Sequence, residues 1–334
     1  MLYRNLGKTG LQISEISLGS WLTYGNTTEM TLAKACIKTA HDLGINFYDT
    51  ADAYNNGEAE LFLGETLHDH ERSKIVLASK CYFPMSDNPN DKGLSRKHIF
   101  ESVHASLKRL RTDYLDLYQC HRYDEQTPLE ETVRAMSDLV QQGKILYWGV
   151  SQWSSAQIQE AVGIARQLGC YQPVSNQPIY NMLNRSLEIE VMQTCYNNGL
   201  GIVVFSPLSQ GILTGKYSGG QIPEDSRAAN QAINHFMHKR LTPETLSKVD
   251  DLKRLANDLE LTLTQLALAW TLQSAAVTSA IIGASRPEQI EENVKAAGIQ
   301  LSESTMTEID NLLGTAPVDQ YTGQRIVALN TSKN

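Results

Sequence analysis

Cysteine is scarce in this chain, and long apolar runs are absent. The cysteines number five in 334 residues, lie far apart and form no CxxC pair: Cys36, Cys81, Cys120, Cys170 and Cys195. This spacing excludes a disulfide framework and a cysteine-based zinc site, so we expect free thiols. No stretch approaches the roughly 18 apolar residues that a transmembrane helix requires. We therefore expect no membrane insertion.

Excess positive charge is also lacking, because 29 Lys and Arg residues face 37 Asp and Glu residues and the net charge is −8. Such a chain is poorly suited to nucleic acid, whose phosphates bind mainly Lys and Arg. The short basic run Lys108, Arg109 and Arg111 is typical of a solvated helix end. The N-terminus has no apolar secretory core but suggests a hairpin around Gly7 to Gly10, and we expect a cytoplasmic protein.

No metal-ligand pattern stands out either. His68 and His70 are two residues apart, which is not ligand spacing on a helix, and no third ligand lies nearby. We expect no metal. The acidic residues Glu58 and Glu60 fall where a helix should begin, and the helix dipole accounts for them.

What the sequence does contain is a regular alternation of strand and helix patterns. Eight β-rich apolar runs occur at 16–20, 45–51, 74–80, 114–121, 145–151, 173–177, 201–206 and 278–283. Apolar residues at helical spacing lie between them, at 32–43, 99–110, 129–140 and 252–259. Eight such units predict an α/β chain, one (β/α)8 TIM barrel domain spanning residues 1–334 with an N-terminal β-hairpin. A doubly wound open sheet is the alternative, but the GxGxxG expected after its first strand is missing.

The longest irregular segment follows the seventh strand. It runs from about Ser206 to Leu241 and is rich in Gly, Ser and Asn. Loops of this length in a compact domain are usually functional, so this segment is a candidate lid.

Polar residues cluster where predicted strands end, which is where barrel active sites lie. Asp49 and Tyr54 follow the second strand, Lys80 closes the third and His121 closes the fourth. A nearby ammonium lowers the pKa of a tyrosine, and a carboxylate keeps that ammonium charged. A histidine can hydrogen-bond the carbonyl oxygen that is being reduced. Together these side chains predict proton transfer to a carbonyl, with Tyr54 as the acid.

The motifs around these residues resemble one family over nearly the whole chain. GINFYDTADAYNNGEAELFLGETL is similar to the second-strand signature of the aldo-keto reductases, and GASRPEQIEEN to the segment with which they hold the adenosine phosphate. LGKTGL, LGSW and VFSPLSQGILTGKY resemble the branch of the voltage-gated potassium channel β-subunits and their bacterial relatives. The resemblance implies a catalytic tetrad of Asp49, Tyr54, Lys80 and His121, a small aldehyde or ketone as substrate, and NADPH/NADP+ as cofactor.

The resemblance also implies which residues hold that cofactor. They are Ser151, Gln152 and Gln177 at the nicotinamide amide, Phe205 on its ring, Ser206, Pro207, Leu208, Gln210 and Lys216 at the pyrophosphate and ribose, Gly283, Ser285, Gln289, Glu292 and Asn293 at the adenosine, and Ser20, Trp21, Asp49, Arg227 and Arg286 around them. Ser285 and Arg286 should lie at a helix N-terminus, which favours a phosphate, and so we expect NADPH over NADH.

Two positions depart from the channel β-subunits, which carry asparagine in place of His121 and arginine in place of Gln152. The first difference favours an ordinary reductase. Two alternatives stay open: a regulatory subunit that senses NADP(H) with slow turnover, and a lyase that forms a Schiff base on Lys80. The branch includes tetramers and octamers, so a homo-oligomer is expected.

Three further side chains have two interpretations each. Cys81 and Cys120 adjoin Lys80 and His121, but strand alternation should turn them behind the barrel. Trp21 and Tyr180 could belong to the core, although their positions at strand ends favour the substrate pocket.

Overall fold

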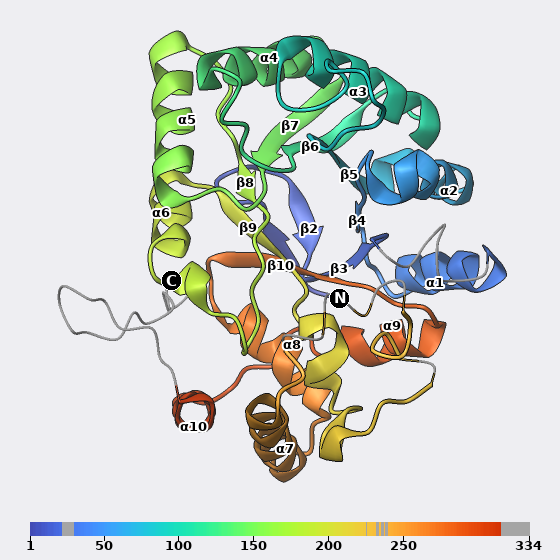
Figure 1. Cartoon of the computed structure of the whole chain (residues 1–334), viewed down its shortest axis with the longest axis vertical. Coiled ribbons are helices and arrows are strands. Elements are labelled where there is room, and N and C mark those ends of the chain that lie inside the picture. The colour runs from blue at the N-terminus through green and yellow to red at the C-terminus, as the bar shows by residue number, and fades with distance from the viewer. Residues whose placement is uncertain (22–29, 225, 232–233, 235–236, 238–239, 315–334) are drawn as a thin grey trace.

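Eight parallel strands close into a barrel (Figure 1) in the computed structural model, which describes residues 1–21, 30–224, 226–231, 234, 237 and 240–314. Around the barrel the strands are β3 (Ile16–Gly19), β4 (Phe47–Asp49), β5 (Val76–Cys81), β6 (Leu115–Cys120), β7 (Ile145–Val150), β8 (Ser175–Asn176), β9 (Gly201–Phe205) and β10 (Val277–Ile282), and β10 pairs with β3 to close the ring. All eight predicted strands are confirmed, and the open-sheet alternative is wrong.

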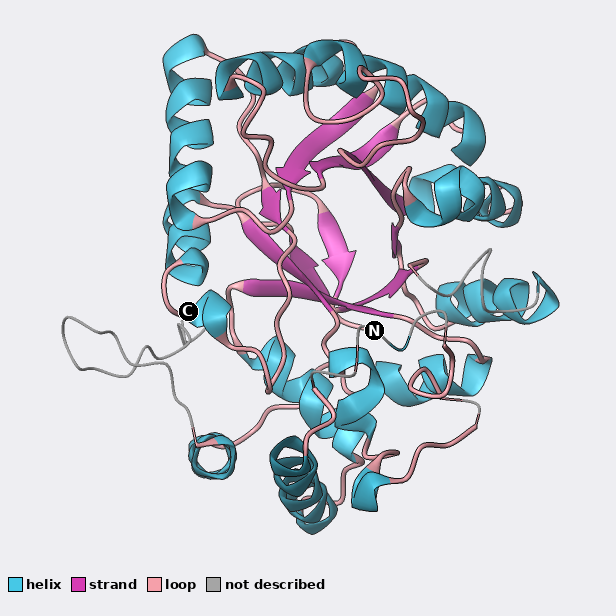
Figure 2. Cartoon of the chain, viewed as in Figure 1, coloured by secondary structure: helices cyan, strands magenta, loops and turns pink. Residues whose placement is uncertain are grey.

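Helices surround the barrel on its outside (Figure 2). They are α1 (Met30–Asp42), α2 (Glu58–Leu67), α3 (Arg96–Leu110), α4 (Leu129–Gln141), α5 (Ser155–Leu168), α6 (Val191–Asn198), α7 (Pro243–Asp258), α8 (Leu263–Gln273), α9 (Pro287–Val294) and α10 (Glu303–Leu313). Hydroxyl side chains that accept a hydrogen bond from the first helical turn fix several starts, at Ser95, Ser154, Thr242, Thr262 and Ser302. None of the described helices has the length and apolar character needed to cross a bilayer.

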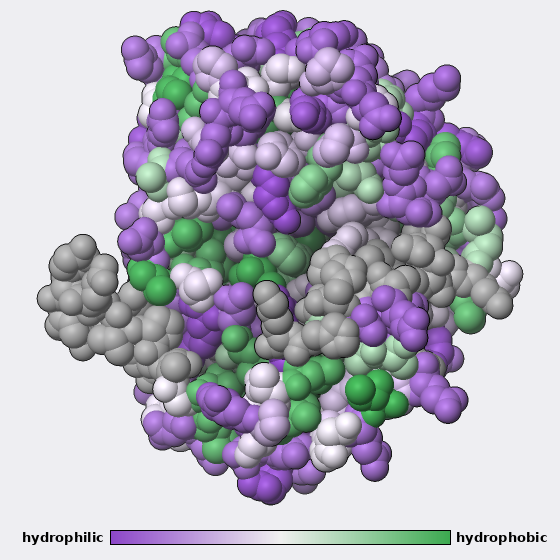
Figure 3. All heavy atoms as spheres, in the orientation of Figure 1, coloured by the Kyte–Doolittle hydropathy of each residue, from purple (hydrophilic) through white to green (hydrophobic). Residues whose placement is uncertain are grey.

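Strand alternation divides the apolar residues into two layers. A small cluster fills the barrel interior and includes Phe47, Ala78 and Leu117, whereas a much larger cluster lies between strands and helices. Cys81 and Cys120 are fully buried in the outer layer, which confirms that they lie behind the barrel. In Figure 3 hydrophilic residues dominate the outer helices, and hydrophobic residues gather around a central hollow.

The predicted N-terminal hairpin is present and closes the bottom of the barrel. Strands β1 (Tyr3–Asn5) and β2 (Gln12–Ser14) pair antiparallel, and Leu6 and Ile13 pack into the interior cluster. The Gly7 turn has a φ of 57°, and a Cβ there would lie 2.2 Å from the carbonyl oxygen of Gly199. Only glycine fits so close to the start of β9.

The long segment after the seventh barrel strand, β9, is also confirmed. No α-helix begins between Phe205 and α7 among the described residues, and the short 3₁₀ helices η4 (Ser209–Thr214) and η5 (Ser218–Gly220) interrupt it. Positions 225, 232–233, 235–236 and 238–239 of the predicted lid lie outside the described residues, as do the last 20 residues of the predicted domain, 315–334.

Candidate active site

Asp49 and Lys80 owe their place in the barrel to strand alternation. Asp49 lies two residues after the inward-facing Phe47, and Lys80 two residues after the inward-facing Ala78. Each therefore points into the barrel at the carboxyl end of its strand, where only 3% of Asp49 and 0% of Lys80 is exposed. An ion pair buried this deeply is stable only if its remaining hydrogen-bonding groups also find partners.

Tyr54 reaches the same point through an irregular turn rather than a strand. It begins the 3₁₀ turn η1 (Tyr54–Gly57), in which Asn55 and Asn56 have φ values of 48° and 51°. Asparagine tolerates the left-handed conformation better than most residues, and glycine follows it. The turn carries the chain into α2 and leaves the tyrosine ring beside Lys80.

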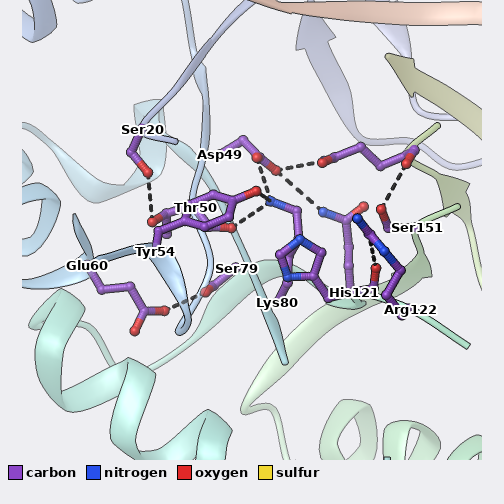
Figure 4. Close-up of polar contacts among 12 residues, drawn as sticks. Ser20, Asp49, Thr50, Tyr54, Glu60, Ser79, Lys80, His121, Arg122 and Ser151 are labelled. Atoms are coloured by element: carbon purple, nitrogen blue, oxygen red, sulfur yellow. Dashed lines mark hydrogen bonds and ion pairs between the residues drawn. The ribbon is translucent and has the colours of Figure 1, made fainter. Parts of the chain in front are cut away.

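The Lys80 ammonium joins these groups (Figure 4). Nζ donates to Asp49 Oδ1 at 2.6 Å, to the carbonyl oxygen of Thr50 at 2.8 Å and to the Tyr54 hydroxyl oxygen at 3.2 Å. Three acceptors thus use all three donors of the ammonium. Because Tyr54 accepts one of these bonds, its own proton is free to be donated elsewhere.

Burial and charge act in opposite directions on both groups. Burial alone would lower the pKa of Lys80, but Asp49 and Tyr54 outweigh it, and the pKa is raised. Burial raises the pKa of Tyr54, and the ammonium of Lys80 counters this only in part. The lysine therefore lowers the tyrosine pKa relative to burial alone, as expected, yet the pKa stays above its ordinary value. The residues present hold a protonated phenol beside a permanent positive charge.

His121 lies across from the tyrosine at the end of β6. Its ring meets the Tyr54 ring edge to face, with centroids 5.6 Å apart, and the Phe83 ring in the same manner at 4.9 Å. Burial, helped by the charges of Lys80 and Arg122, holds the pKa of His121 well below its usual range. The imidazole is therefore neutral at physiological pH and can donate a single N–H hydrogen bond.

Two amide side chains hold the other oxygen of the Asp49 carboxylate. Gln177 Nε2 donates to Oδ2 at 2.8 Å and Gln119 Nε2 approaches it at 3.5 Å. Gln119 was missed by the sequence reasoning, as was Thr50, which also accepts a bond from the Ser20 hydroxyl at 2.9 Å. A signal existed for Gln119, since it precedes His121 by two residues on the same inward face.

The predicted nicotinamide contacts come together at the ends of β7, β8 and β9. The Ser151 hydroxyl donates to the carbonyl oxygen of Gln177 at 2.9 Å, and both residues are buried. Gln152 has a left-handed φ of 60°, and its amide oxygen lies 3.5 Å from the Ile179 backbone nitrogen. Phe205 is half-buried at the end of β9.

The predicted pyrophosphate contacts follow on the loop after β9. Ser206 and Gln210 both have left-handed φ values, of 53° and 61°, and Gln210 Nε2 donates to Ser206 Oγ at 2.6 Å. Arg227 bonds the amide oxygen of Gln210, and its pKa is lowered by burial. Lys216 is exposed, with its side chain next to Gly211. Pro207 is buried and Leu208 half-buried.

The predicted adenosine contacts lie after β10, which pairs with β9. Ser285 and Arg286 are exposed just before α9, and the Gln289 side chain accepts a bond from the Ser285 backbone nitrogen at 2.8 Å. Gly283 is exposed and Asn293 is buried. Glu292 accepts a bond from the Thr262 hydroxyl at 2.6 Å. The basic side chains along β9 and β10 suit an anionic ligand.

Three interpretations from the sequence are wrong. Glu60 is fully buried rather than a mere helix-start charge, and it pairs with Arg109 Nε at 2.7 Å and accepts a bond from the Ser79 hydroxyl. Arg109 is accordingly not a solvated helix end. Tyr180 belongs to the core, because its hydroxyl bonds Glu188 at 2.6 Å and its ring stacks on Trp270.

The other tentative pocket residue, Trp21, lies next to the tyrosine. Its ring centroid is 6.5 Å from that of Tyr54, and the side chain is half-buried. The described residues contain no group of three or more His, Cys, Asp or Glu side chains that could hold a metal ion.

A second carboxyl group is buried behind the catalytic turn. Asp52 accepts a bond from Ser102 Oγ at 2.7 Å, and Ser102 in turn accepts one from the Tyr118 hydroxyl at 3.0 Å. Its other oxygen, Oδ1, has no hydrogen-bond partner. Burial raises the pKa of Asp52 to about 7.

Comparison with known proteins agrees with this geometry. Two similar proteins bear the name "Probable voltage-gated potassium channel subunit beta": one from Arabidopsis thaliana is 44% identical over 95% of this chain and 98% of its own length. The other, from Oryza sativa subsp. japonica, is 44% identical over 90% of this chain and 92% of its own. Residues 15–313 match the model of the Aldo/keto reductase family. The chain belongs to that family, whose members carry out NAD(P)-dependent oxidoreduction.

Proposed function

We propose that this protein reduces a small aldehyde or ketone to the alcohol with NADPH, using Tyr54 as the general acid. The observation that carries the proposal is the buried Lys80 ammonium, which is bonded to both Asp49 and Tyr54 at the barrel mouth. A phenol whose oxygen already accepts a bond from an ammonium is poised to give up its proton, because the phenolate that remains is stabilised at once.

The chain's own residues divide the remaining work. His121, as a neutral donor, orients the carbonyl oxygen toward the Tyr54 hydroxyl and stabilises the charge that develops on it. Asp49 keeps Lys80 charged and in place, and Gln177 and Gln119 in turn hold Asp49. Bound NADPH supplies the hydride. The apolar walls of Trp21 and Phe83 exclude water from the reacting carbonyl.

The second half of the mouth would hold the cofactor. Ser151, Gln152 and Gln177 would bind the nicotinamide amide, and the loop residues from Ser206 to Lys216 the pyrophosphate. Exposed Ser285 and Arg286 before α9, with Gln289 one turn further on, would bind the 2′-phosphate of NADPH. The positive and hydrogen-bonding groups there match a dianion. The lyase alternative receives no support, since Lys80 is fully used by its three acceptors.

The test of the proposal is Tyr54→Phe, which keeps the ring and removes the proton. We expect turnover of every active aldehyde, followed by loss of NADPH absorbance, to fall about 10²- to 10⁴-fold, the usual contribution of a general acid. Cofactor binding, measured by fluorescence titration, should stay nearly intact. Tyr171→Phe, at a tyrosine that is 54% exposed, is the matched control. A Tyr54→Phe protein that keeps most of its rate would contradict the assignment.

A second candidate is a regulatory subunit that senses NADP(H) and turns over slowly. The names of the two relatives favour it, as does the long segment after β9, which could close over the cofactor. Cofactor should then remain bound during purification, and its release should limit turnover. Stopped-flow measurement decides: a burst of NADPH oxidation followed by a slow steady rate supports the sensor, and no burst at saturating substrate opposes it.

The cellular setting is part of the same proposal. We place the protein in the cytoplasm, as a homo-oligomer of four or eight copies, because the similar channel subunits suggest such assemblies. Size-exclusion chromatography with light scattering would establish the number of copies.

A further inference from the structure

Arg122 brings a second positive charge to the pocket, directly after the catalytic histidine. Its side chain is half-buried, and Nη1 donates to the carbonyl oxygen of His121 at 2.5 Å. The guanidinium carbon lies 5.4 Å from the centroid of the Phe83 ring, which itself packs against the His121 ring. In Figure 4 Arg122 lies beside His121 at the catalytic end of the barrel.

Nothing among the described residues neutralises this charge. Other partly buried cations of the chain are paired: Lys80 with Asp49 and Arg109 with Glu60. Arg122 forms no such ion pair in the part of the chain that the structure describes. The nearest acidic residue in sequence, Asp124, is already occupied by the Leu94 backbone nitrogen and the Thr127 hydroxyl. A half-buried guanidinium without a carboxylate is unfavourable unless a ligand supplies the anion.

The charge of Arg122 also acts on the reacting groups. Behind burial and the charge of Lys80, it contributes to the low pKa of His121. It opposes the effect of burial on the pKa of Tyr54 as well. The guanidinium is thus close enough to influence both groups that would contact the carbonyl.

We propose that Arg122 binds the anionic end of the substrate, so that the preferred substrates are aldehydes or ketones that carry a carboxylate. This inference rests on the proposed reductase function and specifies its substrate class. The planar guanidinium can form two parallel hydrogen bonds with a carboxylate, which fixes the orientation of the substrate as well as its position. Phe83 would support the apolar part between the carboxylate and the carbonyl.

The cofactor phosphates are the other source of an anion. They are assigned to the ends of β9 and β10, whereas Arg122 follows β6, and β7 and β8 separate β6 from β9 in the barrel. A role for Arg122 in cofactor binding would make Arg122→Gln weaken NADPH, and this is measured in the same experiment.

The experiment compares two aldehydes of nearly equal shape, 4-carboxybenzaldehyde and the neutral 4-nitrobenzaldehyde. The quantity measured is the ratio of their kcat/KM values, which cancels any disturbance of His121 that affects both. We expect Arg122→Gln to lower this ratio about 10- to 100-fold, Arg122→Lys to lower it less, and added salt to lower it in the wild type. The matched control is Arg134→Gln, at an exposed arginine on α4. It should leave the ratio unchanged.

A ratio that Arg122→Gln leaves unchanged, or a loss that appears in NADPH affinity instead, overturns the inference while the reductase function stands. Failure of the wild type to reduce any aldehyde overturns the reductase function. Calorimetry on the NADP+-loaded protein then tests Arg122 without turnover. There, 4-carboxybenzyl alcohol should bind more tightly than 4-nitrobenzyl alcohol, and Arg122→Gln should remove the difference. Equal binding of the two alcohols to the wild type overturns the inference.

Discussion

At the ends of β3 to β6 the polar side chains are buried and bonded to one another, whereas at the ends of β7 to β10 many of them lie on loops and reach solvent. Lys80 is fully enclosed by its acceptors, while Lys216 and Arg286 are exposed. The first region holds a fixed geometry before any ligand arrives, as proton transfer requires. The second region keeps hydrogen-bonding groups available, as a site that must admit a large cofactor requires.

The backbone differs in the same sense. Left-handed non-glycine residues occur at Gln152, Ser206, Ser209 and Gln210 on the second side. On the first side the comparable residues, Asn55 and Asn56, lie in the turn after Tyr54 and not in the strands. Unfavourable backbone conformations of this kind persist only where the surroundings enforce them, and they concentrate at functional sites. The comparison predicts that substitutions on the first side affect turnover and those on the second affect cofactor affinity.

The largest effect is expected for Lys80→Met. Loss of the ammonium removes the group that stabilises the phenolate of Tyr54, so turnover should fall about 10²- to 10⁴-fold. It also leaves Asp49 buried without its cation, which should lower the free energy of unfolding by about 3–5 kcal/mol. Kinetics and urea unfolding measure the two effects. Lys38→Met, at a lysine that is 72% exposed, is the control.

The pH profile sharpens this prediction. Without the ammonium the pKa of Tyr54 should rise further, and the alkaline limb of the pH-rate profile should move with it. An unchanged profile in Lys80→Met would show that the lysine does not act on the tyrosine.

A smaller effect is expected for Asp52→Asn, behind the catalytic turn. Burial raises the pKa of Asp52 to about 7, so the folded protein keeps a proton that the unfolded chain releases near its ordinary value of 3.8. Stability that is present below pH 4 is therefore lost as the pH rises toward 7. Asparagine removes this loss, and the free energy of unfolding should fall by about 2–4 kcal/mol less between pH 4 and 7.5.

Denaturant unfolding at several pH values measures this difference. Asp69→Asn, at an aspartate whose side chain is 92% exposed, should follow the wild type. If the stability curves of Asp52→Asn and wild type stay parallel, the carboxyl is ionised throughout and its pKa is not raised.

The smallest effect, and the counterpart on the second side, is expected for Arg286→Ala. If Arg286 contacts the 2′-phosphate, its loss should weaken NADPH binding about 10- to 100-fold and leave NADH nearly unaffected. Turnover at saturating NADPH should stay close to that of the wild type. Fluorescence titration with both cofactors measures the preference, with Arg254→Ala as an exposed control. Equal weakening of both cofactors would show that this segment does not read the phosphate.

The same division explains what the sequence could predict. Alternation along short strands determines where Asp49, Lys80 and His121 point, so pattern reasoning placed them and the barrel correctly. Glu60 and Arg109 were misjudged because their pairing joins α2 to α3, and no local pattern reports a contact between helices. Tyr180 was misjudged because it follows a two-residue strand and turns back into the core. Which cofactor contacts form depends on loops, whose conformation local periodicity does not encode.

The hairpin of β1 and β2 has a kinetic consequence. With Leu6 and Ile13 filling the base, a molecule that reacts at Lys80 and Tyr54 must enter and leave by the opposite end. A narrow vessel closed at the bottom imposes a queue. Whatever lies deepest arrives first and departs last. If the nicotinamide lies beneath the carbonyl compound, the order of addition is set by the shape of the container, and excess substrate or alcohol delays the exchange of spent cofactor.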